Sequence, residues 1–252
     1  TLKFIFAPMV HWPEVMVTYE TSTRTLFSAD AFGKFGRSDA KELWLDEARR
    51  YYINIVGKYG AMVQSLFKKL SGVTIDRICA LHGLVLTENL PYYLDLYNTW
   101  SLYNAEVNGV LVAYASIYGN TKKAALSLVS KLNERGVACE AIDLARSDMS
   151  QNIALAFKYS GLVVAAPTCN AEIFPVAETF LKQLKSHNFQ SRKVGIIENG
   201  SWAPIAAKLI RSYFEGLKGV AICDNVVTIM SAPNAKTNIA LDMLADEFVE
   251  VK

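Results

Sequence analysis

The second half of the sequence predicts an α/β fold with a doubly wound, five-stranded parallel sheet. From about residue 107 onward, apolar segments alternate regularly with amphipathic segments. The run GVLVAYAS (109–116) is apolar almost throughout, as expected of a parallel strand that is buried on both faces. The segment after it has helical spacing and ends at Gly136, a residue typical of helix C-termini. Alternation of this kind indicates a parallel sheet covered by helices.

The remaining elements of this half follow in order. Pro175 would lie in the first turn of its helix, where the N–H that proline lacks is not needed. The expected strands are 109–116, 137–144, 161–168, 193–199 and 220–230, and the expected helices are 120–136, 150–161, 175–186, 204–219 and 235–250.

The first hundred residues are less regular. Three short segments (2–8, 15–21 and 23–30) have the composition of antiparallel strands separated by turns. Residues 40–72 predict one or two amphipathic helices. A short strand is expected at 75–83 and an aromatic-rich helix at 89–104. We therefore expect two domains, 1–106 and 107–252.

Composition narrows the possible functions. The chain has 252 residues, 52% of them hydrophobic, and a net charge of +2, which indicates neither nucleic acid nor an acidic membrane surface as a partner. Its four cysteines form no CxxC pair, which favours free thiols in a reducing cytoplasm. No apolar run approaches the roughly 20 residues that span a bilayer, and the N-terminus lacks the features of a signal peptide. The chain begins inside a strand and without Met, which suggests that sequence precedes it.

Small and polar residues lie together between the strand at 109–116 and its helix, in the stretch SIYGNT. The turn after the first strand of a doubly wound sheet usually binds phosphate, because backbone N–H groups and the helix dipole point there. Glycine allows close backbone approach, and the hydroxyls can donate further bonds. The turn alone is weak evidence, since Asn or Thr often simply caps a helix. The candidate phosphate-binding residues are Ser116, Ile117, Tyr118, Gly119, Asn120 and Thr121.

Two further loops strengthen this interpretation. APTCNAEIFP (166–175) follows the third strand and ENGSWAP (198–204) the fourth, so both lie at the same edge of the sheet as the first loop. A flavin ring would lie there, at the switch point of the strand order. Trp202 could stack on the ring, although surface packing would explain that residue taken alone. Together the loops favour a cofactor site whose other members are Pro167, Thr168, Cys169, Asn170, Asn199, Gly200, Ser201 and Trp202.

The stretch SIYGNT resembles the phosphate loop of flavodoxins, which has the form Ser/Thr-x-x-Gly-Asn-Thr. The resemblance covers about 107–252 and implies FMN; a dinucleotide-binding GxGxxG turn is absent. Cys169 departs from the aromatic or polar residue often found near the flavin ring.

A second group of residues suggests a metal site. His11, Asp30 and His82 each lie at the end of a predicted strand in the first domain. Imidazole and carboxylate groups on converging strand ends are suitable ligands for iron or zinc, and a carboxylate can bridge two metals. The spacing leaves a simpler reading open, in which each histidine is merely hydrogen-bonded and Asp30 belongs to a turn. His187 fits solvated surface.

The order HWPEVMVTYE, LFSADAFG and HG, followed by a flavodoxin module, resembles the flavodiiron proteins, also called A-type flavoproteins. These join a metallo-β-lactamase-like diiron domain, an αβ/βα sandwich, to a flavodoxin domain. The resemblance covers nearly the whole chain. It implies that His11 ligates one iron, that His82 ligates the other and that Asp30 bridges them.

One departure from this family is clear. Its other ligands come from an H-x-E-x-D-H motif before the segment that matches His11, and this chain has no such motif. Three ligands cannot satisfy two irons. We therefore interpret the sequence as a C-terminal portion, whose first domain is the C-terminal half of the sandwich and exposes a face that another half should cover.

The resemblance implies an oxidoreductase that reduces dioxygen to water or nitric oxide to nitrous oxide. Electrons would pass from rubredoxin or a flavin reductase through FMN to the diiron site, in a head-to-tail homodimer. Two alternatives stay open. The chain could be an FMN-binding electron carrier with an incomplete metal site, or a zinc hydrolase; the missing ligands and the flavin module disfavour the hydrolase.

Overall fold

The structure is a computed structural model and describes residues 1–37 and 43–249. The chain divides into two compact units, Thr1–Asn104 and Ala105–Lys252. The domain boundary expected from the sequence, between residues 106 and 107, lies two residues further along. Within the described residues, no helix is long and apolar enough to cross a membrane.

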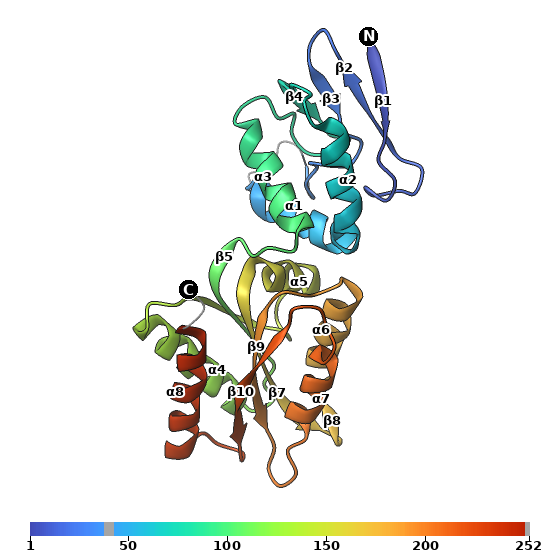
Figure 1. The fold of residues 1–252 in the computed structure, drawn as a ribbon. Helices are drawn as coiled ribbons and strands as arrows, with labels where there is room; N and C mark the ends of the chain where they lie inside the picture. The colour runs from blue at the N-terminus through green and yellow to red at the C-terminus, as the bar shows by residue number, and fades with distance from the viewer. Residues whose placement is uncertain (38–42, 250–252) are drawn as a thin grey trace. The chain divides into compact units, whose positions relative to one another are not determined.

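A four-stranded sheet forms one part of the first unit (Figure 1). Its order is β1 (Leu2–Phe6), β2 (Met16–Glu20), β3 (Thr25–Phe27) and β4 (Arg77–Cys79). The first two pairings are antiparallel, and β3 pairs with β4 in parallel. All four strands were expected from the sequence, and each is shorter than its expected segment.

Helices supply the other part of the first unit. Helix α1 (Trp44–Tyr51) continues through a π turn (Tyr52–Val56) and a 3₁₀ turn (Gly57–Tyr59) into α2 (Gly60–Leu70), and α3 (Leu90–Ser101) follows β4. A Cβ added at Gly60 would lie 2.3 Å from the Ser101 carbonyl oxygen, so only glycine permits this approach of α2 to α3. The first residues of the predicted segment 40–72 lie outside the described residues.

The two faces of the four-stranded sheet differ in burial. Val17, Tyr19, Leu26 and Ile78 point to one face and are buried in the core of the unit. The other face carries large apolar side chains that are about half exposed. These are Leu2, Phe4, Phe6, Met16 and Phe27, with exposures between 45% and 65%. Side chains of this kind on one continuous face are unusual for a free surface.

The second unit contains the parallel sheet, with strand order β10-β9-β7-β5-β6 and every neighbouring pair parallel. A two-residue strand, β8 (Glu172–Ile173), pairs antiparallel with the end of β7. In chain order this is the 2-1-3-4-5 arrangement, whose switch point lies between β5 and β7. The strands of this sheet are β5 (Val107–Tyr114), β6 (Ala138–Asp143), β7 (Tyr159–Cys169), β9 (Lys193–Asn199) and β10 (Ala221–Ile229).

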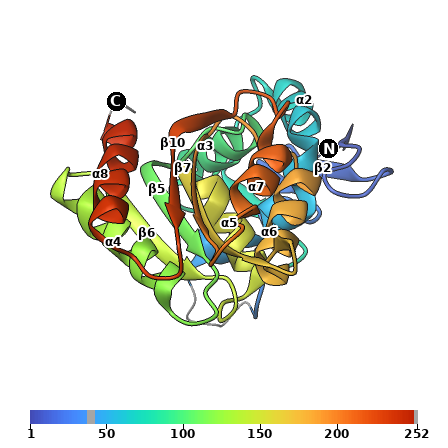
Figure 2. The same ribbon diagram turned by 90° about the horizontal axis from the view of Figure 1, so that it is seen from below.

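Helices cover both faces of this sheet (Figure 2). Helices α4 (Asn120–Glu134) and α8 (Ala235–Val249) lie on one face. The other face carries α5 (Met149–Lys158), α6 (Pro175–Ser186) and α7 (Ala206–Phe214). Central strand residues such as Leu111, Val112 and Val163 are fully buried, which explains the continuous apolar runs of the sequence.

Several helices end earlier than the sequence predicts, and for two of them the cause is local. Helix α5 ends at Lys158, because Tyr159 already pairs with Val107 in the sheet. Helix α7 ends at Phe214, and Gly216 follows with a φ of 77°, which breaks the helix.

Candidate functional site

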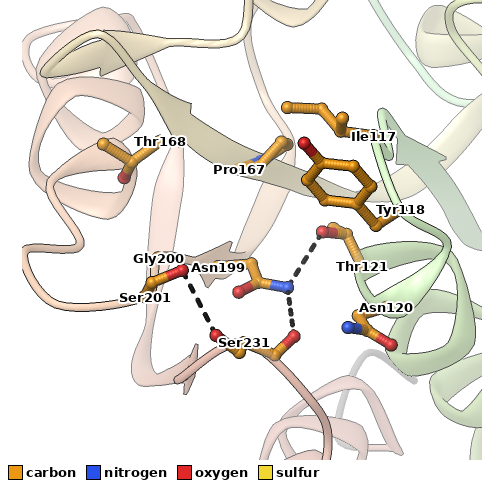
Figure 3. A pocket seen from close by; sticks show the side chains of 10 residues that line it. All are labelled: Ile117, Tyr118, Asn120, Thr121, Pro167, Thr168, Asn199, Gly200, Ser201 and Ser231. Atoms are coloured by element: carbon orange, nitrogen blue, oxygen red, sulfur yellow. Dashed lines mark hydrogen bonds between the residues drawn. The ribbon is translucent and has the colours of Figure 1, made fainter.

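The loop between β5 and α4 forms one wall of a pocket at the carboxyl edge of the parallel sheet (Figure 3). Gly119 has a φ of 85° and an added Cβ would meet nothing within 4 Å, so the backbone conformation, not crowding, calls for glycine. Its N–H donates to Ser116 Oγ at 3.1 Å. No side chain caps the start of α4, so the N–H groups of its first turn are available to an anion.

The last residue of β9 links two loops of this pocket. Asn199 is buried, and its Nδ2 donates to Thr121 Oγ1 at 3.4 Å and to the Ser231 carbonyl oxygen at 3.1 Å (Figure 3). Asn199 therefore ties residues 116–121, which we call the phosphate-type loop, to the loop after β10. Ser231 Oγ donates to Ser201 Oγ at 3.2 Å and closes the same side.

The end of β7 supports the other side of the pocket. Thr168 Oγ1 accepts hydrogen bonds from the backbone N–H groups of Ile205 and Ala206, at 2.9 and 3.1 Å. It thus caps the start of α7 from a neighbouring strand. Beneath it, buried Glu198 accepts from the Ala207 N–H and from the Thr228 hydroxyl, both at 2.8 Å.

Two adjoining cavities result. The first holds about 410 Å³ and the second about 510 Å³, both within the range of cofactor pockets. They share Tyr118, Thr168, Gly200 and Ser201. The first is also lined by Ile117, Asn120, Thr121, Pro167, Asn199 and Ser231, and the second by Asn170, Ala171, Trp202 and Ala203. Tyr118 is 91% exposed and Trp202 is 88% exposed, so both rings are free to stack on a planar ligand.

The cavities include eleven of the fourteen residues expected at the cofactor site. Ser116, Gly119 and Cys169 are not among the lining residues, although Ser116 and Gly119 shape the loop. Sequence reasoning missed Ser231, Ala171 and Ala203. Ser231 could have been found from its place directly after a predicted strand, at the same edge of the sheet.

The three expected metal ligands of the first unit also come together. His11 Nε2 lies 3.4 Å from Asp30 Oδ2, and His82 Nε2 lies 3.8 Å from Asp30 Oδ1. Each histidine thus faces a different oxygen of one carboxylate. A neighbouring cavity of about 520 Å³ is lined by Trp12, Glu14, Val15, Ala29, Asp30 and Leu81.

Backbone contacts hold this cluster in place. The Phe32 N–H donates to Tyr97 Oη at 2.7 Å and secures the turn that carries Asp30. His82 Nδ1 donates to the Lys34 carbonyl oxygen at 2.8 Å. In the neutral ring the Nε2 lone pair then faces Asp30, which is the orientation of a metal-ligating histidine.

Tyr51 closes one side of the cluster. Its ring centroid lies 4.7 Å from that of His82 and 6.3 Å from that of His11. Burial, and secondly the charge of Asp30, raise the pKa of Tyr51, so its phenol stays protonated. Among the described residues its hydroxyl has no hydrogen-bond partner.

The cluster does not complete a metal centre. Within residues 1–37 and 43–249, no group of three or more His, Cys, Asp or Glu side chains is arranged to hold a metal ion. His11, Asp30 and His82 supply three donors, and two irons need more. The described residues therefore do not fit a diiron centre by themselves.

Comparisons with known proteins bear on both units. Residues 112–236 match the family model described as flavodoxin. The second unit is a flavodoxin-like domain. An uncharacterized protein of Methanocaldococcus jannaschii is 28% identical over 92% of this chain and 61% of its own length. The anaerobic nitric oxide reductase flavorubredoxin of Aliivibrio salmonicida is 29% identical over 84% of this chain and 44% of its own length.

Solved structures share the fold of the chain. Rubredoxin oxygen:oxidoreductase of Desulfovibrio gigas matches 98% of this chain with a TM-score of 0.89 and 22% identity. The flavodiiron protein of Giardia intestinalis matches 99% with a TM-score of 0.87 and 21% identity. At these identities the matches establish the α/β fold, including the flavodoxin-like part. The chain spans 64% of each of these two proteins and 61% or less of the two relatives above.

Proposed function

We propose that this chain is the FMN-binding portion of a flavodiiron-type oxidoreductase. The observation that carries the proposal is the pair of cavities at the strand switch point, formed by three loops within a flavodoxin-like domain. FMN supplies one- and two-electron transfer when bound. The loop 116–121 would hold the phosphate, because it combines an uncapped helix start with hydroxyl groups and a glycine at positive φ.

The other cofactor residues have separate tasks under this proposal. Trp202 and Tyr118, the two aromatic residues among those that line the cavities, would cover the flavin ring. Pro167, Thr168, Cys169, Asn170, Gly200 and Ser201 would border the ring. Asn199 would act through its neighbours, because its side-chain amide donates to Thr121 and Ser231.

The proposed reaction is the reduction of dioxygen to water or of nitric oxide to nitrous oxide. Support comes from the names of the similar proteins, which include an oxygen oxidoreductase and a nitric oxide reductase. The electron donor would be rubredoxin or a flavin reductase. We further propose a homodimer and, given four free cysteines, a cytoplasmic location.

Iron binding is part of the proposal only if further donors join His11, Asp30 and His82. A second candidate, favoured by the incomplete donor set, is an FMN-binding electron carrier without a working metal site. Elemental analysis for iron and zinc, normalised to flavin absorbance, separates the two. Two irons for each flavin would support the oxidoreductase, and flavin without stoichiometric metal would support the carrier.

The FMN assignment has its own test. Trp202→Ala should weaken FMN binding and alter the flavin absorption spectrum, because the flavin ring loses the exposed indole as its stacking partner. An unchanged affinity and spectrum would remove Trp202 from the site. Failure of the wild-type protein to bind FMN would overturn the proposed function.

A further inference from the structure

A buried carboxylate lies close to the cofactor cavities, and the binding of FMN does not by itself explain it. Glu198 lies near the end of β9 and is only 7% exposed. The two residues before it, Ile196 and Ile197, are apolar and buried. Moving an ionised carboxylate from water into such surroundings is unfavourable unless hydrogen bonds or opposite charges compensate it. A glutamate at this position therefore needs a specific reason.

The groups that compensate Glu198 are neutral. Its Oε2 accepts a hydrogen bond from the Ala207 N–H and its Oε1 accepts one from the Thr228 hydroxyl, both at 2.8 Å. Both oxygens thus act as acceptors, as those of an ionised carboxylate do. Within residues 1–37 and 43–249, no lysine, arginine or histidine side chain lies within ion-pair distance of Glu198. The carboxylate therefore places a negative charge inside the domain that no cation neutralises.

The start of α7 does not require this charge. Thr168 Oγ1 already accepts from the N–H groups of Ile205 and Ala206, which directly precede the N–H that Glu198 accepts. A neutral oxygen thus satisfies two consecutive N–H groups of this turn, and a neutral amide oxygen at position 198 could satisfy the third. The capping of α7 explains an acceptor at position 198 and leaves the charge of the glutamate unexplained.

The position of this charge relates it to the cavities. Pro167 and Asn199 line the first cavity, and Thr168 lines both (Figure 3). Glu198 directly precedes Asn199 in β9 and lies in register with Ala166 of β7. It also accepts from the N–H next to the two that Thr168 accepts, so the carboxylate lies behind the wall of both cavities. A charge there acts on a ligand through protein, where electrostatic interactions are stronger than in water.

We propose that the buried charge of Glu198 lowers the reduction potential of the bound flavin by disfavouring its reduced, anionic form. This inference rests on the proposed function, because it assumes that FMN occupies the cavities. Oxidised FMN takes up two electrons from a reductant and one proton from water, and so gains one negative charge. A fixed negative charge nearby opposes that gain, so reduced FMN binds less tightly than oxidised FMN. At an effective dielectric constant of about 20, two unit charges about 10 Å apart change an equilibrium constant by roughly tenfold or more.

Two substitutions separate the charge of Glu198 from its hydrogen bonds. Glu198→Gln keeps the shape of the side chain and removes the charge, whereas Glu198→Asp keeps the charge and shortens the side chain. Anaerobic titration of the FMN-loaded protein with dithionite, against a reference dye, gives the midpoint potential and hence the ratio of the affinities for reduced and oxidised FMN. Glu198→Gln should raise this ratio about tenfold, which is about 30 mV for a two-electron couple. Glu198→Asp should keep a ratio close to that of the wild type.

Two controls distinguish a buried charge from a surface charge. Glu215→Gln removes an exposed carboxylate at the other end of α7 and should leave the ratio unchanged, because solvent screens that charge. The effect of Glu198→Gln should persist at about 1 M salt, where the Debye length is about 3 Å. The wild type provides a measurement that needs no variant: at this salt concentration it should bind reduced FMN less tightly than oxidised FMN.

The possible outcomes are distinct. A wild-type midpoint potential in FMN-loaded Glu198→Gln would overturn the proposal and leave the proposed function intact. Equal shifts in Glu198→Gln and Glu198→Asp would assign the effect to the hydrogen bonds at the start of α7 and would also overturn it. Equal affinities of the wild type for reduced and oxidised FMN at high salt would be a third contrary result, and it does not depend on the folding of any variant. Failure of the wild type to bind FMN at all would overturn the proposed function itself.

Discussion

Replacing Gly119 with alanine tests the backbone conformation of the phosphate-type loop without introducing a steric clash. Gly119 precedes α4 with φ 85° and ψ −10°, a conformation that alanine adopts only with strain. An added Cβ would meet no atom within 4 Å, so no steric contact complicates the result. The whole effect of the substitution should come from the backbone.

The size of the effect follows from this geometry. A non-glycine residue at positive φ costs about 1–2 kcal/mol. If the loop keeps its conformation, this cost appears as lower stability and FMN affinity is retained. If the loop relaxes, its N–H groups no longer converge on the phosphate. FMN binding must then restore the strained conformation, so the affinity for FMN falls by at most the 1–2 kcal/mol of strain, which is roughly 5–30-fold.

Gly136 provides the matched control. It ends α4 at the opposite edge of the sheet with a φ of 73°, and an added Cβ there also meets nothing within 4 Å. We expect Gly119→Ala and Gly136→Ala to lose similar free energy of unfolding in urea, and only Gly119→Ala to weaken FMN binding in a fluorescence titration. A Gly119→Ala variant that keeps both the wild-type unfolding free energy and the wild-type FMN affinity, or an equal loss of FMN affinity in both variants, would refute this reasoning.

Three further predictions concern the supporting structure. Thr168→Val removes the acceptor for two N–H groups at the start of α7 and should lower the unfolding free energy by about 1–2 kcal/mol in urea; an unchanged midpoint would contradict the cap. In Gly33→Ala the new Cβ would lie 2.3 Å from His82 Cε1, so the imidazole ring must move. Because the chain has three histidines, the nitrogen-15 NMR signals of this ring can be followed, and they should shift. Unchanged signals would exclude the close approach. Burial, then the charge of Glu247, raise the pKa of Cys223 from 9.0 to about 12. Because the folded-state pKa is the higher one, the contribution of the neutral Cys223 thiol to the free energy of unfolding is complete below pH 9 and is lost as the pH rises toward 12. Between pH 8 and pH 10 the free energy of unfolding of the wild type should fall by about 1.4 kcal/mol more than that of Cys223→Ala. An equal fall in both proteins would show that the thiol is not desolvated.

The exposed face of the four-stranded sheet illustrates a partial success of sequence reasoning. The sequence predicted that the first domain would leave an apolar face uncovered, because the donor set of the family is incomplete in this chain. The side chains on that face, among them Phe4 and Phe6, are indeed 65% and 56% exposed. Which side chains occupy the face followed from the strand register, in which Phe4 lies opposite Thr18 and Phe6 opposite Met16.

The sequence by itself determined the parallel sheet and the phosphate-type loop of this protein. Both depend on local signals, since a strand buried on both faces is apolar throughout and the loop lies within six consecutive residues. The sequence also placed most of the cavity lining, because the carboxyl ends of parallel strands share one edge of the sheet.

Only the tertiary structure decided how distant segments meet. It brought His11 and His82 to opposite oxygens of Asp30, although these residues are 19 and 52 positions from it along the chain. It also placed Ser231 in the cavity and used Thr168 to cap a helix of another segment. Such contacts depend on strand register and on the packing of helices against the sheet, and these are set by the summed burial of many residues, which no short stretch of sequence records.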